Sequence, residues 1–312
     1  MTDVSMRVAY GQALAEYGAA NPRIVVLDAD ISASSQTHYF ASRHPDRFFN
    51  MGIAEAGMVD VGVGLALGGY IPFVNTFAFL LTLRAAEMVR SCVAYAQTNV
   101  KLVGAYGGLS DAFDGPTHHA ITDLAVMCAM PNLTVMVASD AVQVAQMVPL
   151  IAEHPGPVYL RVSRAELPVI HSAEAPLEIG KGKLWQQGSD VTLIATGIMV
   201  TRALDAADIL AAQGVSARVI EIHTLKPLDT ALVRQAALET GAIVTAEEHS
   251  VVGGLGAAVA QALGLHPVPH VRIGVQDCFT ETGPYEALLT RFKMTVNDMA
   301  LAAHQSIEAK QA

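Results

Sequence analysis

Short apolar runs alternate with stretches of helical spacing along the chain. Continuous, β-branched runs at Ile24–Asp28, Lys101–Ala105 and Thr134–Val137 predict strands that are buried on both faces. Apolar residues at helical spacing predict helices over Met6–Tyr17 and Ala54–Leu67. This alternation favours a doubly wound parallel sheet, with ligands at the carboxyl ends of its strands.

The same alternation predicts the remaining elements. In the first half we expect two more strands and two more helices, at Ile71–Val74, Val158–Arg161, Leu83–Gln97 and from about Asp140. In the second half we expect strands at Val191–Ala195, Ala217–Ile222, Ala242–Ala246 and His270–Ile273. The helices expected there lie near Met199–Gln213, Asp229–Glu239, Gly254–Leu263, Pro284–Phe292 and Asn297–Ala309.

The stretch 166–178 separates the two halves. It contains Pro168, Pro176 and few long apolar runs, so we interpret it as a linker. A chain of 312 residues is too long for one ordinary domain and long enough for two. The sequence therefore predicts an α/β fold of two doubly wound domains, 1–165 and 179–312.

Composition limits the class of protein. Hydrophobic residues make up 52% of the chain and charged residues 15%, which suits either a membrane protein or extensive subunit contacts. The best membrane candidate, 61–83, contains several glycines and Pro72, and we reject it as a spanning helix. The N-terminus lacks a signal-peptide pattern, and a net charge of −10 without a basic stripe argues against nucleic acid. We expect a cytoplasmic oligomer.

Cysteines and histidines give little support to a metal site. Cys92, Cys128 and Cys278 are odd in number and far apart, which suits reduced core thiols better than disulfides or metal ligands. His118 and His119 are adjacent in a loop, where neighbouring imidazoles rarely face the same ion. We expect no metal ligands on this chain.

Two residues near predicted strand ends are candidates for cofactor chemistry. Glu55 lies in the first turn of a strongly apolar helix with almost no charged neighbour in the sequence. It either complements the helix dipole or is a desolvated acid that shares a proton near neutral pH. Phe77 follows the strand after Pro72, and it is either core or a flat face for a heteroaromatic ring.

A long loop and three arginines are candidates for substrate binding. The loop 107–119 is rich in glycine and carries Asp114, Thr117, His118 and His119, which suit polyhydroxylated substrates and proton transfer. It can equally be a structural turn. The arginines Arg7, Arg161 and Arg164 can grip a phosphate or carboxylate, or they can pair with the surplus of acids.

The glycine-rich run 253–256 follows a strand and opens a helix, as a dinucleotide-binding loop does. A third glycine at the required spacing is missing, and Glu247 and Glu248 stand where a pyrophosphate would arrive. We therefore reject nicotinamide binding and interpret the run as a helix start packed on the sheet.

The order and spacing of these motifs resemble the transketolase family over the whole chain. Residues 1–165 resemble its pyrimidine-binding domain, and the remainder resembles its C-terminal domain. The resemblance is carried by the runs 7–14 (RVAYGQAL), 27–30 (LDAD), 52–55 (GIAE), 75–78 (NTFA), 114–118 (DGPTH) and 161–164 (RVSR). Several matches in the same order make this signal far more specific than any single motif.

The resemblance implies roles for individual residues. Glu55 matches the glutamate that bonds the aminopyrimidine of thiamine diphosphate, and the apolar helix around it would keep this acid protonated enough to donate. His118 is the second catalytic candidate. Cofactor contacts are implied for Asp30, Phe77 and Leu80, and substrate contacts for Arg7, Ser34, Tyr106, Asp114, His118 and Arg164.

The family also binds Mg²⁺ and the cofactor diphosphate through a Gly-Asp-Gly motif, and no Gly-Asp dipeptide occurs here. The resemblance therefore implies an N-terminal partner subunit that supplies the Mg²⁺ ligands and the diphosphate site. An α₂β₂ heterotetramer is the expected assembly, because two domains of each kind normally complete two sites. High apolar content fits such an obligate contact.

The sequence departs from the family where substrates bind. Tyr106 stands where a phosphate-binding histidine is usual, Ala112 and Phe113 replace Gly-Glu, and Leu80 replaces a frequent aromatic. These changes remove a cationic group and add bulk. We therefore expect an unusual ketose, one with a different anionic terminus or a branched carbon skeleton.

Three alternatives share parts of this pattern. The β subunit of a 2-oxo acid dehydrogenase has the same two-domain plan, and deoxyxylulose-phosphate synthase shares much of this half within a longer chain. Against both stand the runs 75–77 and 114–118, which are patterns of transketolases. A non-catalytic subunit is the third alternative, and the presence together of Glu55, Phe77, Asp114 and His118 argues against it.

Overall fold

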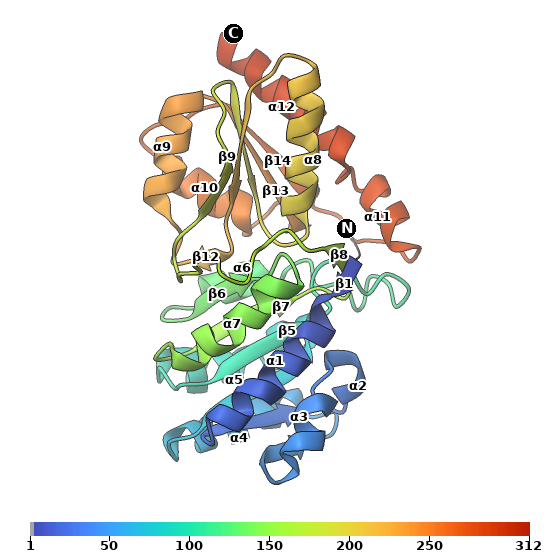
Figure 1. The fold of residues 1–312 in the computed structure, drawn as a ribbon, viewed down its shortest axis with the longest axis vertical. Coiled ribbons are helices and arrows are strands. Elements are labelled where there is room, and N and C mark those ends of the chain that lie inside the picture. The colour runs from blue at the N-terminus through green and yellow to red at the C-terminus, as the bar shows by residue number, and fades with distance from the viewer. Residues whose placement is uncertain (1–2) are drawn as a thin grey trace.

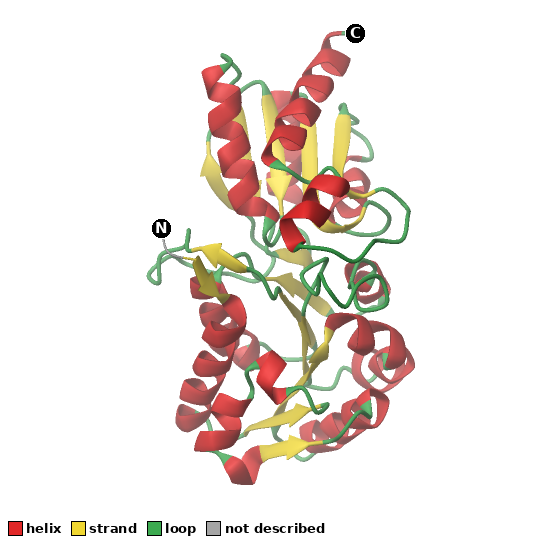
Figure 2. Ribbon diagram, turned by 90° about the vertical axis from the view of Figure 1, so that its right-hand side faces the viewer, coloured by secondary structure: helices red, strands yellow, loops and turns green. Residues whose placement is uncertain are grey.

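The computed structural model describes residues 3–312 and consists of two α/β units stacked along the long axis of the molecule (Figure 1). Each unit has a central sheet with helices on both faces, as the turned view makes clear (Figure 2). The predicted fold class, with two doubly wound units, is confirmed. No helix within residues 3–312 is long and apolar enough to cross a membrane.

The N-terminal unit contains a seven-stranded sheet in the order β12-β6-β7-β5-β4-β2-β3. Its parallel strands are β2 (Ile24–Asp28), β3 (Phe48–Asn50), β4 (Ile71–Phe77), β5 (Lys101–Ala105), β6 (Thr134–Val137) and β7 (Val158–Val162). Strand β12 (Thr224–Lys226) comes from the second half of the chain and pairs antiparallel with β6. The two halves therefore share one sheet.

Helices cover both faces of this sheet. One face carries α1 (Met6–Ala20) packed against α7 (Ala141–Glu153), with α2 (Ser32–Ser35), α3 (His38–Arg43) and η1 (Pro45–Arg47) beside α1 or the sheet edge. The other face carries α4 (Glu55–Leu67), the segments η2 (Leu80–Arg84), α5 (Ala86–Met88) and η3 (Val89–Tyr95), and α6 (Asp123–Ala129).

The C-terminal unit contains a five-stranded sheet in the order β14-β13-β10-β11-β9. Its strands are β9 (Lys183–Gln186), β10 (Val191–Ala195), β11 (Ala217–Glu221), β13 (Ile243–Ser250) and β14 (His270–Val275), and only β9 among them runs antiparallel to its neighbour. Helices α8 (Met199–Ala212) and α12 (Val296–Gln311) pack together on one face. Helices α9 (Thr230–Thr240) and α10 (Leu255–Leu263) cover the other, and α11 (Tyr285–Arg291) precedes α12 (Figure 1).

The prediction of one regular helix over Leu83–Gln97 is wrong. Residues 80–95 form two π-helical segments, η2 and η3, on either side of the single turn α5. The N–H of Ala85 donates to the carbonyl of Leu80 at 3.3 Å, five residues earlier rather than four. This wider turn changes the direction in which side chains leave the helix, as π-helical segments commonly do at functional sites.

The predicted linker contains a short strand that the sequence pattern did not indicate. Strand β8 (Glu166–Pro168) pairs antiparallel with β1 (Asp3–Ser5), so the chain returns to its own beginning before entering the second unit. Both strands have only three residues, and neither has the continuous apolar run that predicts a buried strand.

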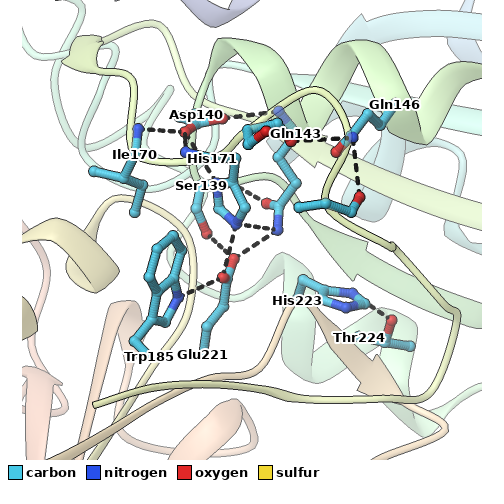
Figure 3. Close-up of polar contacts among 12 residues, drawn as sticks. Ser139, Asp140, Gln143, Gln146, Ile170, His171, Trp185, Glu221, His223 and Thr224 are labelled. Atoms are coloured by element: carbon cyan, nitrogen blue, oxygen red, sulfur yellow. Dashed lines mark hydrogen bonds and ion pairs between the residues drawn. The ribbon is translucent and has the colours of Figure 1, made fainter.

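A buried histidine of the linker joins the two units (Figure 3). His171 Nδ1 lies 2.9 Å from Asp140 Oδ2 at the start of α7, and its Nε2 lies 2.9 Å from Glu221 Oε2 at the end of β11. Burial opposes the charge, but hydrogen bonds to both carboxylates raise the pKa of His171 to about 9. Hydrogen bonds from the imidazolium and other donors lower the pKa values of Asp140 and Glu221 to about 2, against the effect of their burial.

Glu221 holds this junction with more than one partner. Its carboxylate also accepts hydrogen bonds from Ser139 Oγ at 2.7 Å, Gln143 Nε2 at 2.7 Å and Trp185 Nε1 at 2.9 Å (Figure 3). A buried charge is tolerated when donors surround it in this way. The first unit, the linker and the second unit are therefore tied to one carboxylate.

Candidate active site

Glu55 is a buried acid at the first turn of α4, where its carboxylate complements the helix dipole. The residue is 1% exposed, and Arg84 Nη1 from η2 lies 3.1 Å from both carboxylate oxygens. Glu55, which has almost no charged neighbour along the sequence, therefore has a charged partner in the folded chain. The π-helical turn η2 brings Arg84 to the start of α4, and a separation of 29 residues gave no local signal for this pair.

Aromatic rings gather at the carboxyl end of β4. Phe77, half-buried, ends this strand, and its ring centroid lies 4.8 Å from that of Tyr106 and 6.5 Å from that of His118. Phe79 lies 4.8 Å from His118 by the same measure. The predicted cofactor residue Phe77 and the predicted substrate residues Tyr106 and His118 thus lie together at one end of the sheet.

Tyr106 lies between two guanidinium groups. It follows β5 with a positive φ of 61° and is almost fully buried. The guanidinium carbons of Arg7 and Arg164 both lie 5.0 Å from its ring centroid, a distance suited to cation–π attraction. Arg7 Nη1 also donates to the Tyr106 hydroxyl at 3.0 Å and to the carbonyl of Ser34 at 2.8 Å. Four of the predicted substrate residues therefore form one cluster.

The loop after Tyr106 brings acids to this cluster. Asp111 is fully buried, and its Oδ1 lies 2.9 Å from Arg164 Nη1. Burial and the neighbouring Asp114 raise the pKa of Asp111 to about 6, while Arg164 acts in the opposite direction. Asp114 and Phe113 are exposed, and His118 Nδ1 lies 3.0 Å from Thr117 Oγ1.

The second unit supports this loop from behind. Glu248 of β13 accepts a hydrogen bond from the N–H of Leu109 at 2.8 Å and one from the Tyr285 hydroxyl at 2.9 Å. Burial raises the pKa of Glu248 to about 7. Gly108 has a φ of +67°, and a Cβ there would lie 2.3 Å from Glu248 Cδ, so a larger residue would be strained and would displace the Glu248 carboxyl group.

A second contact lies further along the loop. His119 Nδ1 is 2.6 Å from Thr280 Oγ1, and the N–H of Gly283 donates to the carbonyl of Ala112 at 3.3 Å. Burial lowers the pKa of His119, so this imidazole is neutral near neutral pH. The sequence did not decide whether the loop 107–119 is a binding loop or a structural turn. In the structure, contacts from the second unit hold this loop in place.

Arg161 does not join the candidate site. Its side chain is buried, its Nε lies 3.0 Å from Asp123 Oδ2, and its Nη2 donates to the carbonyls of Ala120 and Glu248 at 2.9 and 2.8 Å. The sequence left open whether Arg161 binds a ligand anion or pairs with an acid of the chain, and in the structure it pairs with Asp123. Arg164 combines an acidic partner with an exposed position.

Two predicted cofactor residues, Asp30 and Leu80, lie on other elements. Asp30 is exposed after β2 with a φ of 64°, and its Oδ1 accepts a hydrogen bond from Asn50 Nδ2 at 2.8 Å. Leu80 begins η2 and is half-buried. No contact joins either side chain to Phe77 among the hydrogen bonds and ring contacts of residues 3–312.

The glycine-rich run 253–256 is a helix start, as predicted. Glu247 accepts hydrogen bonds from the N–H groups of Leu255 at 2.7 Å and Gly256 at 2.8 Å. A carboxylate of the chain therefore occupies the place where a helix N-terminus would bind a pyrophosphate. Cys92, Cys128 and Cys278 are free; Cys92 and Cys128 are half-buried, and Cys278 is exposed, so the expectation of a core position is wrong for Cys278.

Comparison with known families decides the relationship. The model described as transketolase, pyrimidine binding domain, matches residues 2–169, and the model described as transketolase, C-terminal domain, matches residues 180–299. The chain belongs to the transketolase family. It carries the family's pyrimidine-binding and C-terminal domains in that order, and membership implies the cofactor thiamine diphosphate.

Relatives of similar length are subunits of split transketolases. A 6-deoxy-6-sulfo-D-fructose transketolase subunit of Clostridium sp. (strain MSTE9) is 42% identical over 98% of this chain and 95% of its own. A subunit of an apulose-4-phosphate transketolase of Phocaeicola vulgatus is 37% identical over 88% of each chain. A solved split-gene transketolase, described as an inactive β4 tetramer, is 44% identical with a TM-score of 0.91, covering 99% of this chain and 100% of that chain.

The residues on this chain suit the pyrimidine part of a cofactor site. Glu55 offers a buried carboxylate and Phe77 a half-buried ring, which are groups that can hold an aminopyrimidine. No group of three or more histidine, cysteine or acidic side chains within residues 3–312 has the arrangement of a metal site. Glu55 and Phe77 thus fit the pyrimidine end of the cofactor.

Proposed function

We propose that the chain is the C-terminal subunit of a split transketolase, which transfers a two-carbon ketol unit from a ketose to an aldose. The main support is that two transketolase domains occupy the chain and that its relatives of equal length are split transketolase subunits. These relatives favour ketol transfer over the oxidation of a 2-oxo acid or the synthesis of deoxyxylulose phosphate.

Glu55 and Phe77 would hold the pyrimidine ring. Thiamine diphosphate, when bound, supplies a nucleophilic carbon and an electron sink for the ketol unit. The Glu55 carboxyl group would hold a proton at a pyrimidine ring nitrogen, and Arg84 would fix its orientation through the contacts at 3.1 Å. Phe77 would stack on the ring, with Leu80 and Asp30 as outer contacts.

The cluster around Tyr106 would bind the donor sugar. Arg7, oriented by its hydrogen bond to the Ser34 carbonyl, and Arg164 would hold the anionic end, because guanidinium groups suit oxyanions. Asp114 and His118 would contact the sugar hydroxyl groups, with His118 able to move a proton at one of them.

An N-terminal partner subunit would complete the site with Mg²⁺ and diphosphate ligands. The relative described as an inactive β4 tetramer supports this requirement, since an assembly of that subunit alone is called inactive. The face of the first unit formed by α4, η2, η3 and the residues before α4 exposes large apolar side chains that suit a subunit contact, namely Ile53, Val61, Leu67, Leu83 and Tyr95. An α₂β₂ heterotetramer in the cytoplasm, where free thiols stay reduced, is the assembly we propose.

The donor would differ from the usual pentose and hexose phosphates. Tyr106 lies between the two arginines that would grip the donor's anionic end, and it offers no positive charge. Relatives named for a sulfosugar and for apulose 4-phosphate support an unusual donor. Turnover of xylulose 5-phosphate at ordinary transketolase rates would contradict this part of the proposal.

Reconstitution tests the function directly. The chain is co-expressed with a split-transketolase N-terminal subunit, supplied with thiamine diphosphate and Mg²⁺, and assayed for ketol transfer from a panel of ketoses. Exchange of the cofactor C2 proton with deuterium is followed by NMR without sugar. A complex that assembles but shows neither C2 proton exchange nor ketol transfer would contradict the proposal.

A further inference from the structure

The cluster around Tyr106 contains a buried acid as well as two bases. Asp111 Oδ1 lies 2.9 Å from Arg164 Nη1, and the Asp111 side chain is fully buried while Arg164 is partly exposed. Asp111 Oδ2 is buried and has no hydrogen-bond partner within residues 3–312. Asp111 therefore contacts Arg164 from the protein interior, while part of the Arg164 side chain is exposed to solvent.

The charge of this cluster follows from its members. Arg7 and Arg164 each carry one positive charge. Burial and the neighbour Asp114 raise the pKa of Asp111 only to about 6, so its carboxyl group is mostly ionised near neutral pH. His119 behind the loop is neutral there, because burial lowers its pKa. The Asp111 carboxylate thus cancels one of the two positive charges within the protein, and the exposed Asp114 adds a second acidic group beside it.

The contact with Asp111 also limits how Arg164 can bind a ligand. A free guanidinium grips a phosphate with two parallel N–H groups, and this fork gives both affinity and orientation. One Nη of Arg164 is directed to Asp111. Arg7 likewise uses Nη1 for both the Tyr106 hydroxyl and the Ser34 carbonyl. Neither arginine presents its whole guanidinium to a ligand.

We propose that Asp111 is a specificity residue that makes this pocket select ketoses with a singly charged far end, such as a sulfonate, over phosphate esters. The inference rests on the proposed function, because it takes Arg7 and Arg164 as the groups that bind the donor's far end. A phosphate ester carries close to two negative charges near neutral pH, since its second pKa is about 6, whereas a sulfonate carries one. The second charge would be repelled by the buried Asp111 carboxylate, and like charges in a binding site oppose binding strongly.

Asp111→Asn tests this role in the reconstituted heteromeric complex. Asparagine keeps the shape and an oxygen for Arg164 but removes the negative charge. The donors compared are 6-deoxy-6-sulfofructose and fructose 6-phosphate, which differ at the far end. We expect the ratio of kcat/KM for the sulfo donor over the phospho donor to fall by roughly tenfold or more in the variant. Glu286→Gln is the control, because it removes one charge from the exposed pair with Arg202 in the second unit.

Inhibition of the wild-type complex gives a second measurement that needs no variant. Methanesulfonate and methyl phosphate are used as competitors of the donor, and methanesulfonate should inhibit at the lower concentration. Stronger inhibition by methyl phosphate, or an unchanged donor ratio in Asp111→Asn with the C2 proton still exchanging, would overturn the role of Asp111 and leave the proposed function standing. A wild-type complex without C2 exchange or ketol transfer would overturn both.

Discussion

The guanidinium group of Arg84 closes over the carboxyl group of Glu55, with Nη1 3.1 Å from each of its two oxygens. The acid is 1% exposed and the arginine side chain 54% exposed, so the pair joins the interior of the first unit to its surface. Elements α4, η2 and η3, which pack together on this face, carry the exposed apolar side chains Val61, Leu83 and Tyr95. Glu55 is thus held in one orientation at a surface that suits a partner subunit.

Glu55→Gln should abolish most activity while leaving assembly intact. Glutamine keeps the size of the side chain but cannot hold a proton for the cofactor, so we expect ketol transfer to fall by roughly 10²- to 10⁴-fold. Transfer is measured by coupled assay, and assembly by size-exclusion chromatography. Glu87→Gln, at an exposed acid of α5, is the matched control and should behave as wild type. Equal rates for the two variants would remove Glu55 from the mechanism.

Tyr106→Phe should weaken donor binding more than turnover. The substitution keeps the ring against Arg7 and Arg164 but deletes the hydroxyl that accepts from Arg7 at 3.0 Å. Loss of one such hydrogen bond is worth about 1 kcal/mol, so KM for the donor should rise about fivefold with little change in kcat. Steady-state kinetics gives both constants. The exposed Tyr70→Phe provides the control, and a change confined to kcat would contradict the assigned role.

Gly108→Ala should destabilise the protein and disturb the substrate loop. Alanine at a φ of +67° is strained, and its Cβ would lie 2.3 Å from Glu248 Cδ. Gly69→Ala separates these effects, because Gly69 has a φ of +90° and no atom within 4 Å of the added Cβ. Backbone strain should lower the free energy of unfolding of each variant by about 1–2 kcal/mol. Only Gly108→Ala should lose more stability than this, because of the added clash, and only Gly108→Ala should raise the KM for the donor. Thermal unfolding and kinetics measure the two effects, and equal losses would show that Glu248 gives way freely.

His171 should make stability fall as the pH rises. Its pKa is about 9 in the folded chain, against an ordinary value of 6.5, so the folded state holds a proton that the unfolded state has lost between these values. The contribution is complete below pH 6.5 and decreases by about 1 kcal/mol per pH unit up to about pH 9. Urea unfolding at several pH values measures it. His171→Gln should be less stable and lack this slope, whereas His266→Gln, at an exposed site, should keep it.

Local sequence patterns predicted the buried strands well. The runs Ile24–Asp28, Lys101–Ala105, Thr134–Val137 and Val191–Ala195 coincide with β2, β5, β6 and β10, because strands covered on both faces are apolar throughout. Strands β1, β3, β8 and β12 have three residues each and leave little pattern to detect. Their pairing depends on tertiary contacts.

Side-chain partners were less accessible to sequence reasoning than single residues. Glu55, Tyr106 and Arg164 were identified as candidates, yet the partners Arg84 and Asp111 were not. These partners lie 29 and 53 residues away from the groups they bind. No periodicity relates positions so far apart, since the sheet topology and the π-helical turn bring them together. Asp111 lies in the same loop as Asp114, and only Asp114 matched a residue of the family pattern.

Strand β12 has a consequence for how the chain can be divided. It comes from residues beyond the first family domain but pairs with β6, where the N–H of Val137 donates to the carbonyl of His223 at 2.9 Å. A gene fragment ending at residue 169, where the first family match ends, would leave β6 as a bare sheet edge. Bare edges recruit other strands, so such a fragment would be prone to aggregate. The two family domains of this chain are therefore structurally interdependent, and we expect them to fold together.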